Sequence, residues 1–351
     1  MGCIEAAKIC TIPFYNILWA ELLLSELIIK YASLSNESVR PVTIQYSVDP
    51  ERQPVSKWIA KLLDHSYANS QRRQRAKVLV NPYSGRGLAK HWFSKDIEPL
   101  LRAARWNIDV VETTQANHGM NILEQLDVDE YDVVVVCSGD GLAHEVFNGL
   151  GKRPDTRTAL TKIAVAHIPC GSGNALSHSV NDTGNAGEAT LSVIKGVRKP
   201  LDLISITQGD KRSLSFLSQA TGIAAESDLA TEHLRWIGDT RFHLGILWRV
   251  LFKKVYPADV AVKVAIEGKS SIREHYEREI QKLALEDNRV PEGDLAKNDQ
   301  SHIGLPPLKY GTIRDKLPED WAVIPCDNLG ILYCGNVSLF PFQLCVPTSK
   351  F

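Results

Sequence analysis

The sequence predicts an α/β fold organised on a parallel sheet, and three observations lead to it. Residues 131–137 include four valines in a row without the alternation of a half-exposed strand, which is typical of a strand covered on both faces. From Lys77 onward, strand-like stretches alternate with segments of helical spacing, as in sheets with right-handed crossovers. Three of the strands end in glycine-rich polar turns, at the edge where open α/β sheets bind ligands.

The first 74 residues are expected to form an N-terminal extension that packs on the domains after it. An apolar segment at 17–32 indicates a buried helix or a pair of strands, because Glu21, Glu26 and Lys30 make it a poor membrane span. A β-rich stretch follows at 42–48, and then an amphipathic segment around Trp58. The pattern alone does not indicate what this extension does.

The parallel sheet is expected within residues 75–200, where strands and helices take turns. Apolar runs predict strands at 78–81, 108–113, 131–137 and 163–169, and helical spacing predicts helices at 88–105, 119–126 and 142–150. The turns NPYSGRG, SGDG and CGSGN follow the first, third and fourth of these strands.

Residues 201–351 are expected to form a second domain of strands and hairpins. Strand-like stretches occur at 201–207, 214–222, 261–267, 321–325 and 330–334, and residues 228–252 have helical spacing. The segment 268–319 is polar, charged and punctuated by proline, which indicates an insertion or a mobile loop.

Composition excludes some classes of partner. The net charge of −1 and the isoelectric point of 6.8 provide no global basic field, so nucleic acid is not expected as a partner; the basic run QRRQRAK at 71–77 is a local exception. The seven cysteines include no CxxC pair, which argues against a zinc site or a disulfide framework and favours a reducing, cytoplasmic compartment. No metal-ligating residues are predicted.

The three glycine turns share one plausible purpose, which is to hold phosphate groups. Such turns expose several backbone N–H groups in a small concavity, and the helix that follows adds its positive N-terminus. The chain has no GxxxxGK[ST] motif, so it is not a P-loop enzyme. Each turn alone is a weak signal, because ordinary loops have the same composition.

Asp140 stands among these glycines and cannot be there to attract phosphate. Three roles stay open for its carboxylate: pairing with a metal ion, accepting a proton from a nucleophilic hydroxyl, or capping a helix. Capping is a serious alternative, since aspartate is a favoured N-cap and a helix is expected from Leu142.

At these residues the chain resembles a known family. VLVNPYSGRG, SGDGLAHEVFNGL and IPCGSGNALS, in this order, resemble the three glycine-rich blocks of the diacylglycerol kinase-type lipid kinases. DLATEHLRWIGDTRF at 228–242 resembles the block that distinguishes sphingosine (sphingoid long-chain base) kinases from diacylglycerol and ceramide kinases. IPFYNILWAEL near the N-terminus is similar to fungal long-chain base kinases in particular.

The resemblance implies a Rossmann-like nucleotide domain over 75–200 and an antiparallel β-sandwich that binds the lipid, as in the NAD kinase and diacylglycerol kinase folds. ATP and Mg²⁺ would lie between them. Asp140 would be the general base that takes the proton from the primary hydroxyl of the lipid, which then attacks the γ-phosphate. The positions that match nucleotide contacts are Asn81, Ser84, Gly85, Thr113, Ser138, Gly139, Gly141, Gly171, Ser172, Gly173, Arg235 and Arg241.

The resemblance also implies the substrate contacts. Asp228 matches the acidic residue that meets the substrate ammonium, with Ser218 and Glu232 nearby. A carboxylate there would favour a sphingoid base over neutral diacylglycerol by a charge-assisted hydrogen bond of about 1.5–3 kcal/mol. The alternatives are a helix N-cap for Asp228 and a solvated helix face for Arg235 and Arg241. Residues Trp236, Leu244, Leu247, Trp248 and Leu251 are expected in the core or along a lipid channel.

The chain departs from the family pattern at two places. Tyr83 stands where some relatives have a basic residue, so Arg86 is a candidate replacement as a phosphate contact. After Asn336, the tail VSLFPFQLCVPTSKF replaces further strands and a GDGE-like acidic block, so the second domain is expected to be incomplete.

Three functions therefore stay open: a sphingoid-base kinase, a diacylglycerol or ceramide kinase, and an inactive form that only binds nucleotide or lipid. The lipid substrate implies transient contact of a cytoplasmic protein with a membrane surface. The sequence does not indicate an oligomeric state.

Overall fold

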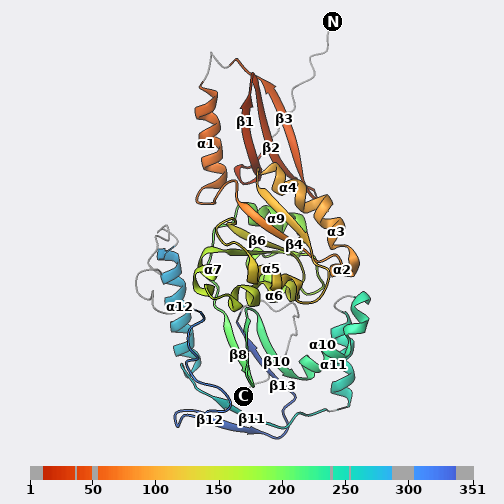
Figure 1. The fold of residues 1–351 in the computed structure, drawn as a ribbon, viewed down its shortest axis with the longest axis vertical. Coiled ribbons are helices and arrows are strands. Elements are labelled where there is room, and N and C mark those ends of the chain that lie inside the picture. Colours follow the sequence, from red (N-terminus) through yellow and green to blue (C-terminus); the bar gives the residue numbers. More distant parts are fainter. Residues whose placement is uncertain are drawn as a thin grey trace.

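The N-terminal unit is a three-stranded antiparallel sheet covered by one helix. The computed structural model describes residues 11–35, 38–49, 54–237, 240–252, 254–286 and 304–336 (Figure 1). The unit consists of η1 (Phe14–Asn16), β1 (Ile17–Leu23), β2 (Glu26–Leu34), β3 (Val39–Ser47) and α1 (Val55–Tyr67), with strand order β1-β2-β3. The apolar segment at 17–32 is therefore a strand pair, one of the two expected forms.

A four-stranded parallel sheet forms the centre of the molecule, as predicted. Its strands are β4 (Arg75–Val80), β5 (Asn107–Glu112), β6 (Val133–Ser138) and β7 (Ala164–Pro169), in the order β5-β4-β6-β7. The chain moves from β4 to one side and then returns to the other, so the order reverses beside β4. Ligands bind at such switch points in open α/β sheets, beyond the carboxyl ends of the strands.

Helices cover both faces of this sheet (Figure 1). They are α2 (Ser84–Gly87), α3 (Ala89–Trp92), the π-helical turn η2 (Phe93–Ile97), α4 (Glu98–Ala103), α5 (His118–Gln125), α6 (Asp140–Lys152), α7 (Thr156–Lys162), α8 (Ala175–Asn181) and α9 (Ala186–Ile194). The helix expected at 88–105 is thus interrupted by a π-helical turn, and the helix expected from Leu142 begins at Asp140.

The valines of β6 show how the core is divided. Val133 and Val135 belong to a cluster that includes α4, α9 and the N-terminal sheet, whereas Val134 and Val136 belong to a cluster with α5, α6 and α7. Successive side chains of a strand point to opposite faces, so the unbroken apolar run reflects burial on both sides. The N-terminal unit shares the first cluster with the parallel-sheet unit.

The second half of the chain consists of separate antiparallel strand pairs and helices. Its elements are β8 (Ile204–Gln208), β9 (Lys211–Ser215), β10 (Ser218–Gly222), α10 (Ile223–Ala230), η3 (Glu232–Ile237), α11 (Thr240–Leu251), β11 (Ala258–Val262), α12 (Lys269–Glu286), β12 (Ala322–Cys326) and β13 (Ile331–Gly335). The pairs are β8–β9, β10–β13 and β11–β12. Antiparallel pairing is therefore confirmed, in two-stranded sheets within the described residues.

Two expectations for this half are wrong in part. The strand expected at 261–267 lies earlier, as β11, because Ala258–Val262 are the residues that pair with β12. The segment expected as a loop from Gly268 begins with α12, a polar helix that ion pairs along its surface stabilise, such as Arg273–Glu277 at i,i+4. Residues 287–303 of the insertion and the tail after Asn336 lie outside the described part of the chain.

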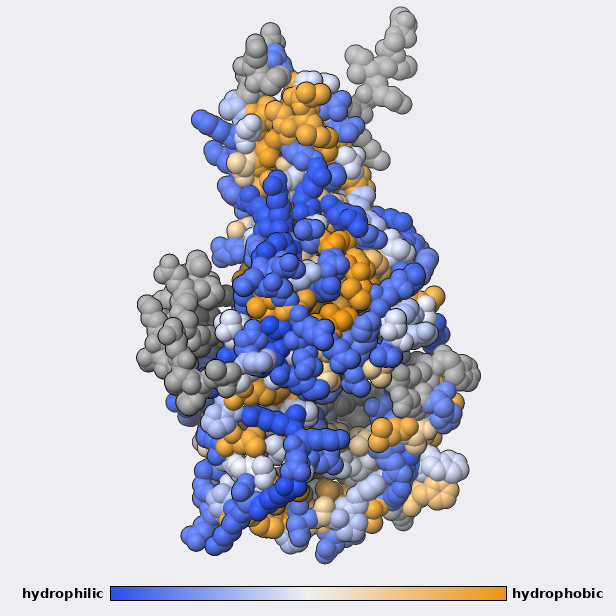
Figure 2. All heavy atoms as spheres, viewed as in Figure 1, coloured by the Kyte–Doolittle hydropathy of each residue, from blue (hydrophilic) through white to orange (hydrophobic). Residues whose placement is uncertain are grey.

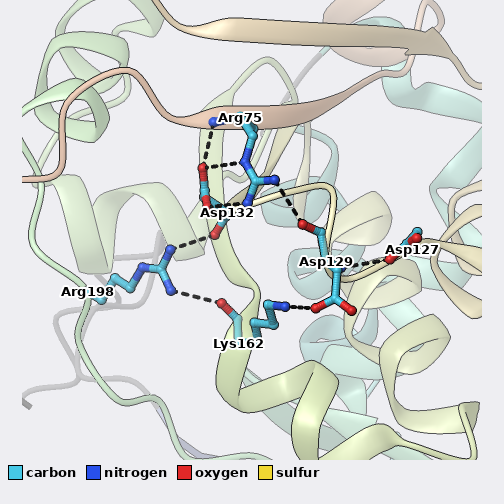
Figure 3. Close-up of polar contacts among 6 residues, drawn as sticks. All are labelled: Arg75, Asp127, Asp129, Asp132, Lys162 and Arg198. Carbon is cyan, nitrogen blue, oxygen red and sulfur yellow. Dashed lines mark hydrogen bonds and ion pairs between the residues drawn. The ribbon is translucent and has the colours of Figure 1, made fainter. Parts of the chain in front are cut away.

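The basic run at 71–77 is used within the protein. Arg75 at the start of β4 donates two side-chain hydrogen bonds to the carboxylate of Asp132, at 2.9 and 3.2 Å, and one to the carbonyl of Asp129 (Figure 3). Arg198 donates to the carbonyl oxygens of Asp132 and Lys162, both at 2.8 Å. The network ties together the segments that lead into β4, β6 and β7, so it anchors the amino ends of these strands.

Other members of the run have partners too. Arg72 pairs with Asp64, Lys77 pairs with Asp109, and the guanidinium of Arg73 lies 4.3 Å from the centre of the Trp19 ring. The positive side chains of this run, which were candidates to bind an anionic partner, therefore contact groups of the protein itself.

Lys195 joins the N-terminal unit to the parallel-sheet unit. Its buried ammonium donates to the carbonyl oxygens of Ile17 and Ser66, at 2.5 and 3.2 Å, and lies 3.6 Å from the centre of the Tyr67 ring. The Tyr67 hydroxyl in turn donates to the Leu18 carbonyl at 2.6 Å. Burial lowers the pKa of Lys195 to about 7, in spite of these contacts.

Among the described residues, no helix is both long and apolar enough to cross a membrane.

We predict that Lys195 makes the stability of the chain depend on pH. An unfolded lysine keeps its proton up to about pH 10.4, whereas folded Lys195 releases it near pH 7, so the unfolded state binds more protons between these values. The free energy of unfolding should therefore rise with pH in this window, by at most about 1.4 kcal/mol per pH unit.

Chemical unfolding of the wild type and of Lys195→Met between pH 6.5 and 9.5 measures this contribution, because methionine fills the space without titrating. The difference in stability between the two proteins should shift in favour of the wild type as the pH rises. A constant difference would contradict the assignment.

Candidate functional site

The three glycine turns meet at the carboxyl edge of the parallel sheet. The hydroxyl of Ser84, in the first turn, accepts a hydrogen bond from the Gly139 N–H at 3.1 Å and lies 3.4 Å from the Ser138 hydroxyl. The Cys170 N–H, in the third turn, donates to the Ser138 carbonyl at 2.9 Å. The middle turn is thus bonded to both of its neighbours.

Glycine is required where these turns touch. A Cβ atom on Gly171 would lie 2.4 Å from the Gly139 Cα and 2.8 Å from its nitrogen, which is closer than real Cβ contacts. A Cβ on Gly85 would lie 2.5 Å from the Cys170 carbonyl oxygen, and Gly85 is also left-handed, with φ +57°. The sequence pattern predicted glycine turns, and the structure shows that backbone packs directly on backbone there.

The first turn has an uncommon backbone. Gly85, Arg86 and Gly87 are successive left-handed residues with φ of 57°, 61° and 79°. This conformation costs a residue such as Arg86 about 1–2 kcal/mol, and backbone strain of this kind clusters at ligand sites. Asn81 shapes the entry to the turn, because its side-chain oxygen accepts from the Tyr83 N–H at 3.0 Å. Arg86 and Tyr83 are both exposed at this edge.

Asp140 caps a helix, but not the helix that it begins. Its two carboxylate oxygens accept hydrogen bonds from the backbone N–H groups of Ala175 at 2.9 Å and Leu176 at 3.0 Å, at the start of α8. No side chain caps α6 itself, whose N-cap is Gly139. The carboxylate is half-buried and fixed in direction, and each oxygen retains a second lone pair. It is therefore oriented to accept a proton or to bind a cation.

Two polar residues behind the turns were not predicted. The side-chain amide of Asn174 accepts from the Gly171 N–H and donates to the Gly171 carbonyl, both at 2.8 Å. His167 is buried below the middle turn and donates from Nε2 to the Ser138 carbonyl at 3.0 Å. Burial lowers the pKa of His167, so its ring is neutral at pH 7. Asn174 ends the CGSGN motif and could have been found there, but His167 lies inside an apolar strand and gives no signal.

Thr113 lies next to this site, at the end of β5. Its backbone N–H donates to the Val80 carbonyl at 2.8 Å, and its side chain is buried. The loop after it is held by Glu145 of α6, whose carboxylate accepts from the N–H groups of Asn117 at 3.0 Å and Gly119 at 2.9 Å. Glu145 was not predicted as a site residue, although it belongs to the SGDGLAHE block. It connects the Thr113 loop to the helix that starts at Asp140.

Asp228 and Arg241 form a second cluster on the hairpin of α10 and α11. Arg241 is 7% exposed and donates to the Asp228 carboxylate at 2.8 Å and to the Thr231 hydroxyl at 3.4 Å. The alternative of a solvated helix face is wrong for Arg241, because its side chain is buried. The alternative of a helix N-cap is wrong for Asp228, because α10 starts five residues earlier, at Ile223. The side chains of Glu232, Arg235 and Trp236 lie outside the described part of the structure.

A second carboxylate of α10 was missed. The carboxylate of Glu226 accepts from the Lys254 ammonium at 2.5 Å and from the Tyr256 hydroxyl, and pairs with Arg249 at 3.5 Å. The hydrogen bond from Lys254 is the main cause that lowers the pKa of Glu226 to about 2. Glu226 and Asp228 thus each bind an arginine of α11, which fixes the hairpin.

The apolar side chains of α11 are exposed, so a core position for them is wrong. Leu244, Leu247, Trp248 and Leu251 are between 50% and 68% exposed. Figure 1 shows α10 and α11 on the same side of the molecule as α2 and α3, below the turns, and Figure 2 shows apolar patches at this lower right end. Ser218 lies at the start of β10, where it pairs with Gly335 of β13, and in the described part of the chain no hydrogen bond joins it to Asp228.

The structure therefore brings the predicted residues into two groups. The residues of the first three blocks and Thr113 surround the carboxyl edge of the sheet, and Asp228 and Arg241 bind each other on the hairpin. In the described residues no cluster of three or more His, Cys, Asp or Glu side chains is suited to hold a metal ion.

Comparisons with known proteins find similar sequences for most of the chain. Residues 75–206 match the diacylglycerol kinase catalytic domain, and residues 3–68 match a domain of unknown function, DUF7493. The chain is 41% identical over 325 residues to sphingoid long chain base kinase 5 of Saccharomyces cerevisiae, covering 80% of this chain and 47% of the relative. It is 31% identical to sphingoid long chain base kinase 4 of Schizosaccharomyces pombe, over 83% of this chain and 63% of the relative. The chain thus spans between about half and two thirds of these relatives.

A solved structure is similar in part. A putative diacylglycerol kinase from Bacillus anthracis str. Sterne matches with a TM-score of 0.44 and 21% sequence identity, over 55% of this chain and 62% of that one.

We predict that Gly171→Ala separates the second and third turns. The new methyl group would overlap backbone atoms of Gly139, which cannot move as a flexible side chain can, so the variant should lose about 1–3 kcal/mol of stability. Thermal and urea unfolding measure the loss. Gly330→Ala is the matched control, because its Cβ would meet nothing closer than 3.7 Å. Equal losses in both variants would contradict the close approach.

Proposed function

We propose that this chain, whose residues 75–206 belong to the diacylglycerol kinase catalytic domain family, is a sphingoid-base kinase that transfers the γ-phosphate of ATP to a primary hydroxyl. The product would be the sphingoid base 1-phosphate. The observation that carries the proposal is the position of Asp140, a carboxylate of fixed direction among three glycine turns at the switch point of the sheet. Similarity to sphingoid long chain base kinases over 80% of the chain supports the choice of substrate.

The turns supply what ATP phosphates need. Backbone N–H groups in left-handed and tight turns form anion-binding concavities, and the N-terminus of α6 adds its positive end. Asn81, Ser84, Gly85, Ser138, Gly139, Gly141 and the turn from Gly171 to Gly173 would contact the nucleotide, together with Thr113. Arg86, exposed in the first turn, would bring a positive charge that Tyr83 does not have.

Asp140 would act on the acceptor. Phosphoryl transfer depends mainly on positioning and on stabilising charge, so a carboxylate that accepts the hydroxyl proton and holds the oxygen in line contributes to both. The N–H groups of Ala175 and Leu176 keep its oxygens in place, and the buried ring of His167 holds the carbonyl of Ser138 next to it.

Mg²⁺ fits this site as a companion of the nucleotide. Magnesium usually keeps several waters and binds through phosphate oxygens with one or two carboxylates, so it does not need a protein cluster. Asp140 is the carboxylate that could share it. When bound, the ion would neutralise charge on the transferred phosphoryl group.

Asp228 would recognise the ammonium of the sphingoid base, with Ser218 and Glu232 near its hydroxyls. The carboxylate is 58% exposed although its partner Arg241 is buried, so a cation can approach it from solvent. The exposed apolar residues of α11 support transient contact with a membrane surface, where the lipid resides. The catalytic domain is also consistent with a diacylglycerol kinase, which differs at Asp228.

We predict that Asp140→Asn lowers phosphate transfer at least about 10²–10⁴-fold, because an amide cannot take the hydroxyl proton. The assay is ATP- and Mg²⁺-dependent phosphorylation of dihydrosphingosine by this chain, with ATP affinity measured in parallel and expected to be retained. A folded but inactive wild type would instead identify a form that only binds nucleotide or lipid.

We predict that Asp228→Asn lowers kcat/KM for sphingosine by about 10–100-fold, the loss of one charge-assisted hydrogen bond. Activity toward diacylglycerol, measured in the same preparation, should not fall in proportion. Glu226→Gln is the matched control, because it removes a negative charge from the same helix at a carboxylate bound to Lys254, and it should leave the lipid preference unchanged. An unchanged preference in Asp228→Asn would refute its role.

A further inference from the structure

Helix α6 connects the candidate base to the second half of the chain. It begins at Asp140, at the carboxyl edge of the sheet, and its last two turns lie against β9. Asn148 occupies this far end, eight residues after Asp140, which corresponds to about 12 Å along the helix axis. It lies well away from the turns that would hold ATP.

The amide of Asn148 pairs with the backbone of one residue of β9. Its Oδ1 accepts from the Leu214 N–H at 2.9 Å, and its Nδ2 donates to the Leu214 carbonyl at 2.8 Å. The other Nδ2 hydrogen goes to the His144 carbonyl, also at 2.8 Å. A flipped amide would oppose donor to donor and acceptor to acceptor at Leu214, so the contacts fix its orientation.

The side-chain amide of Asn148 bonds to Leu214 as the backbone of a neighbouring antiparallel strand would. Two hydrogen bonds between the same pair of residues are the pattern of a bonded pair in an antiparallel ladder. Leu214 lies opposite Ser205 of β8 on its other side, so Asn148 occupies the free edge of β9. The amide therefore holds the β8–β9 hairpin at one register, to within a single residue.

The surroundings make these bonds specific. Asn148 is 7% exposed and Leu214 is 4% exposed, so neither could bond to water instead. Apolar groups also pack at this contact. Gly151 lies so close to Leu214 that a Cβ on it would be 2.6 Å from the Leu214 side chain, and the ring centroids of Phe147 and Phe216 lie 5.2 Å apart. Apolar contacts of this kind tolerate sliding, whereas the paired hydrogen bonds are directional.

We infer that Asn148 is a positioning residue, which sets the lipid-binding half of the chain at a fixed distance and angle from Asp140. The inference rests on the proposed kinase function, and Asn148 itself touches neither substrate. A shift of about 1 Å at the reacting atoms can cost about 10²-fold in rate, so the register of this contact governs how well the lipid hydroxyl meets the γ-phosphate.

Asn148→Leu tests the inference, because leucine fills a similar volume and removes only the polar pairing. The variant should lose at least about tenfold in kcat/KM for dihydrosphingosine, whereas its dissociation constant for ATP should stay within about twofold of the wild type. Asn148→Asp, which sets a carboxylate against the Leu214 carbonyl, should lose more. Asn121→Leu, at an exposed asparagine of α5, is the matched control and should leave both quantities unchanged.

Unchanged kcat/KM in folded Asn148→Leu would overturn the inference, and so would a parallel loss of ATP binding, which indicates general unfolding. Hydrogen exchange separates this result from a failure of the proposed function. If the wild type transfers no phosphate, the Leu214 amide should still exchange at least about tenfold faster in Asn148→Leu, with the amides of Ala175 and Leu176 unchanged. Equal exchange of the Leu214 amide in the wild type and in Asn148→Leu would refute the inference that Asn148 fixes the register of the β8–β9 hairpin.

Discussion

The contact between the backbones of Gly139 and Gly171 is the constraint on which the site depends. The turns after β6 and β7 approach so closely that no Cβ fits between them, and the turn after β4 joins them through Ser84 and Gly85. Three segments from distant parts of the chain thereby meet at one edge of the sheet. The parallel sheet makes this possible, because it brings the carboxyl ends of its strands to one edge. The strand order reverses beside β4, and in open α/β sheets ligands bind at such a reversal.

Helix α6 transmits this arrangement to the rest of the molecule. Three of its polar side chains bond to backbone groups of three other elements: Asp140 to the start of α8, Glu145 to the start of α5, and Asn148 to β9. The same helix thus carries the candidate base and contacts the loop after Thr113 and the β8–β9 hairpin of the second half. The carboxylates do this through helix N-termini, where negative charge is stabilised by the unpaired N–H groups and the helix dipole. Capping a helix is therefore compatible with a chemical role for a residue such as Asp140.

Several charged side chains elsewhere in the described part of the chain bond within the protein. The arginines at 72–75 anchor the N-terminal unit and the amino ends of the strands, and Lys195 links these two parts through carbonyl oxygens and the Tyr67 ring. On the hairpin of α10 and α11, Asp228 and Glu226 each bind an arginine. Asp228 and Arg241, which the family resemblance assigns to ammonium and to phosphate, are each other's partners here.

The sequence by itself determined the central sheet and the presence of the glycine turns, since an unbroken valine run and clusters of glycine with polar residues are local patterns. It also placed Asp140 at a strand end. The contact that requires glycine at Gly171 joins two turns that are distant in the chain, so only the tertiary structure decided it. Only the tertiary structure decided what each polar group bonds to, because such partners are distant in the chain: Asp140 caps α8 across 35 residues, and Asn148 pairs with Leu214 across 66. The sequence did not indicate the contacts of His167 and Glu226 for the same reason. In the second half, the strands expected at 321–325 and 330–334 lie within one residue of β12 and β13, whereas the strand expected at 261–267 was misplaced, because pairing with β12, and not the apolar pattern, sets the ends of β11.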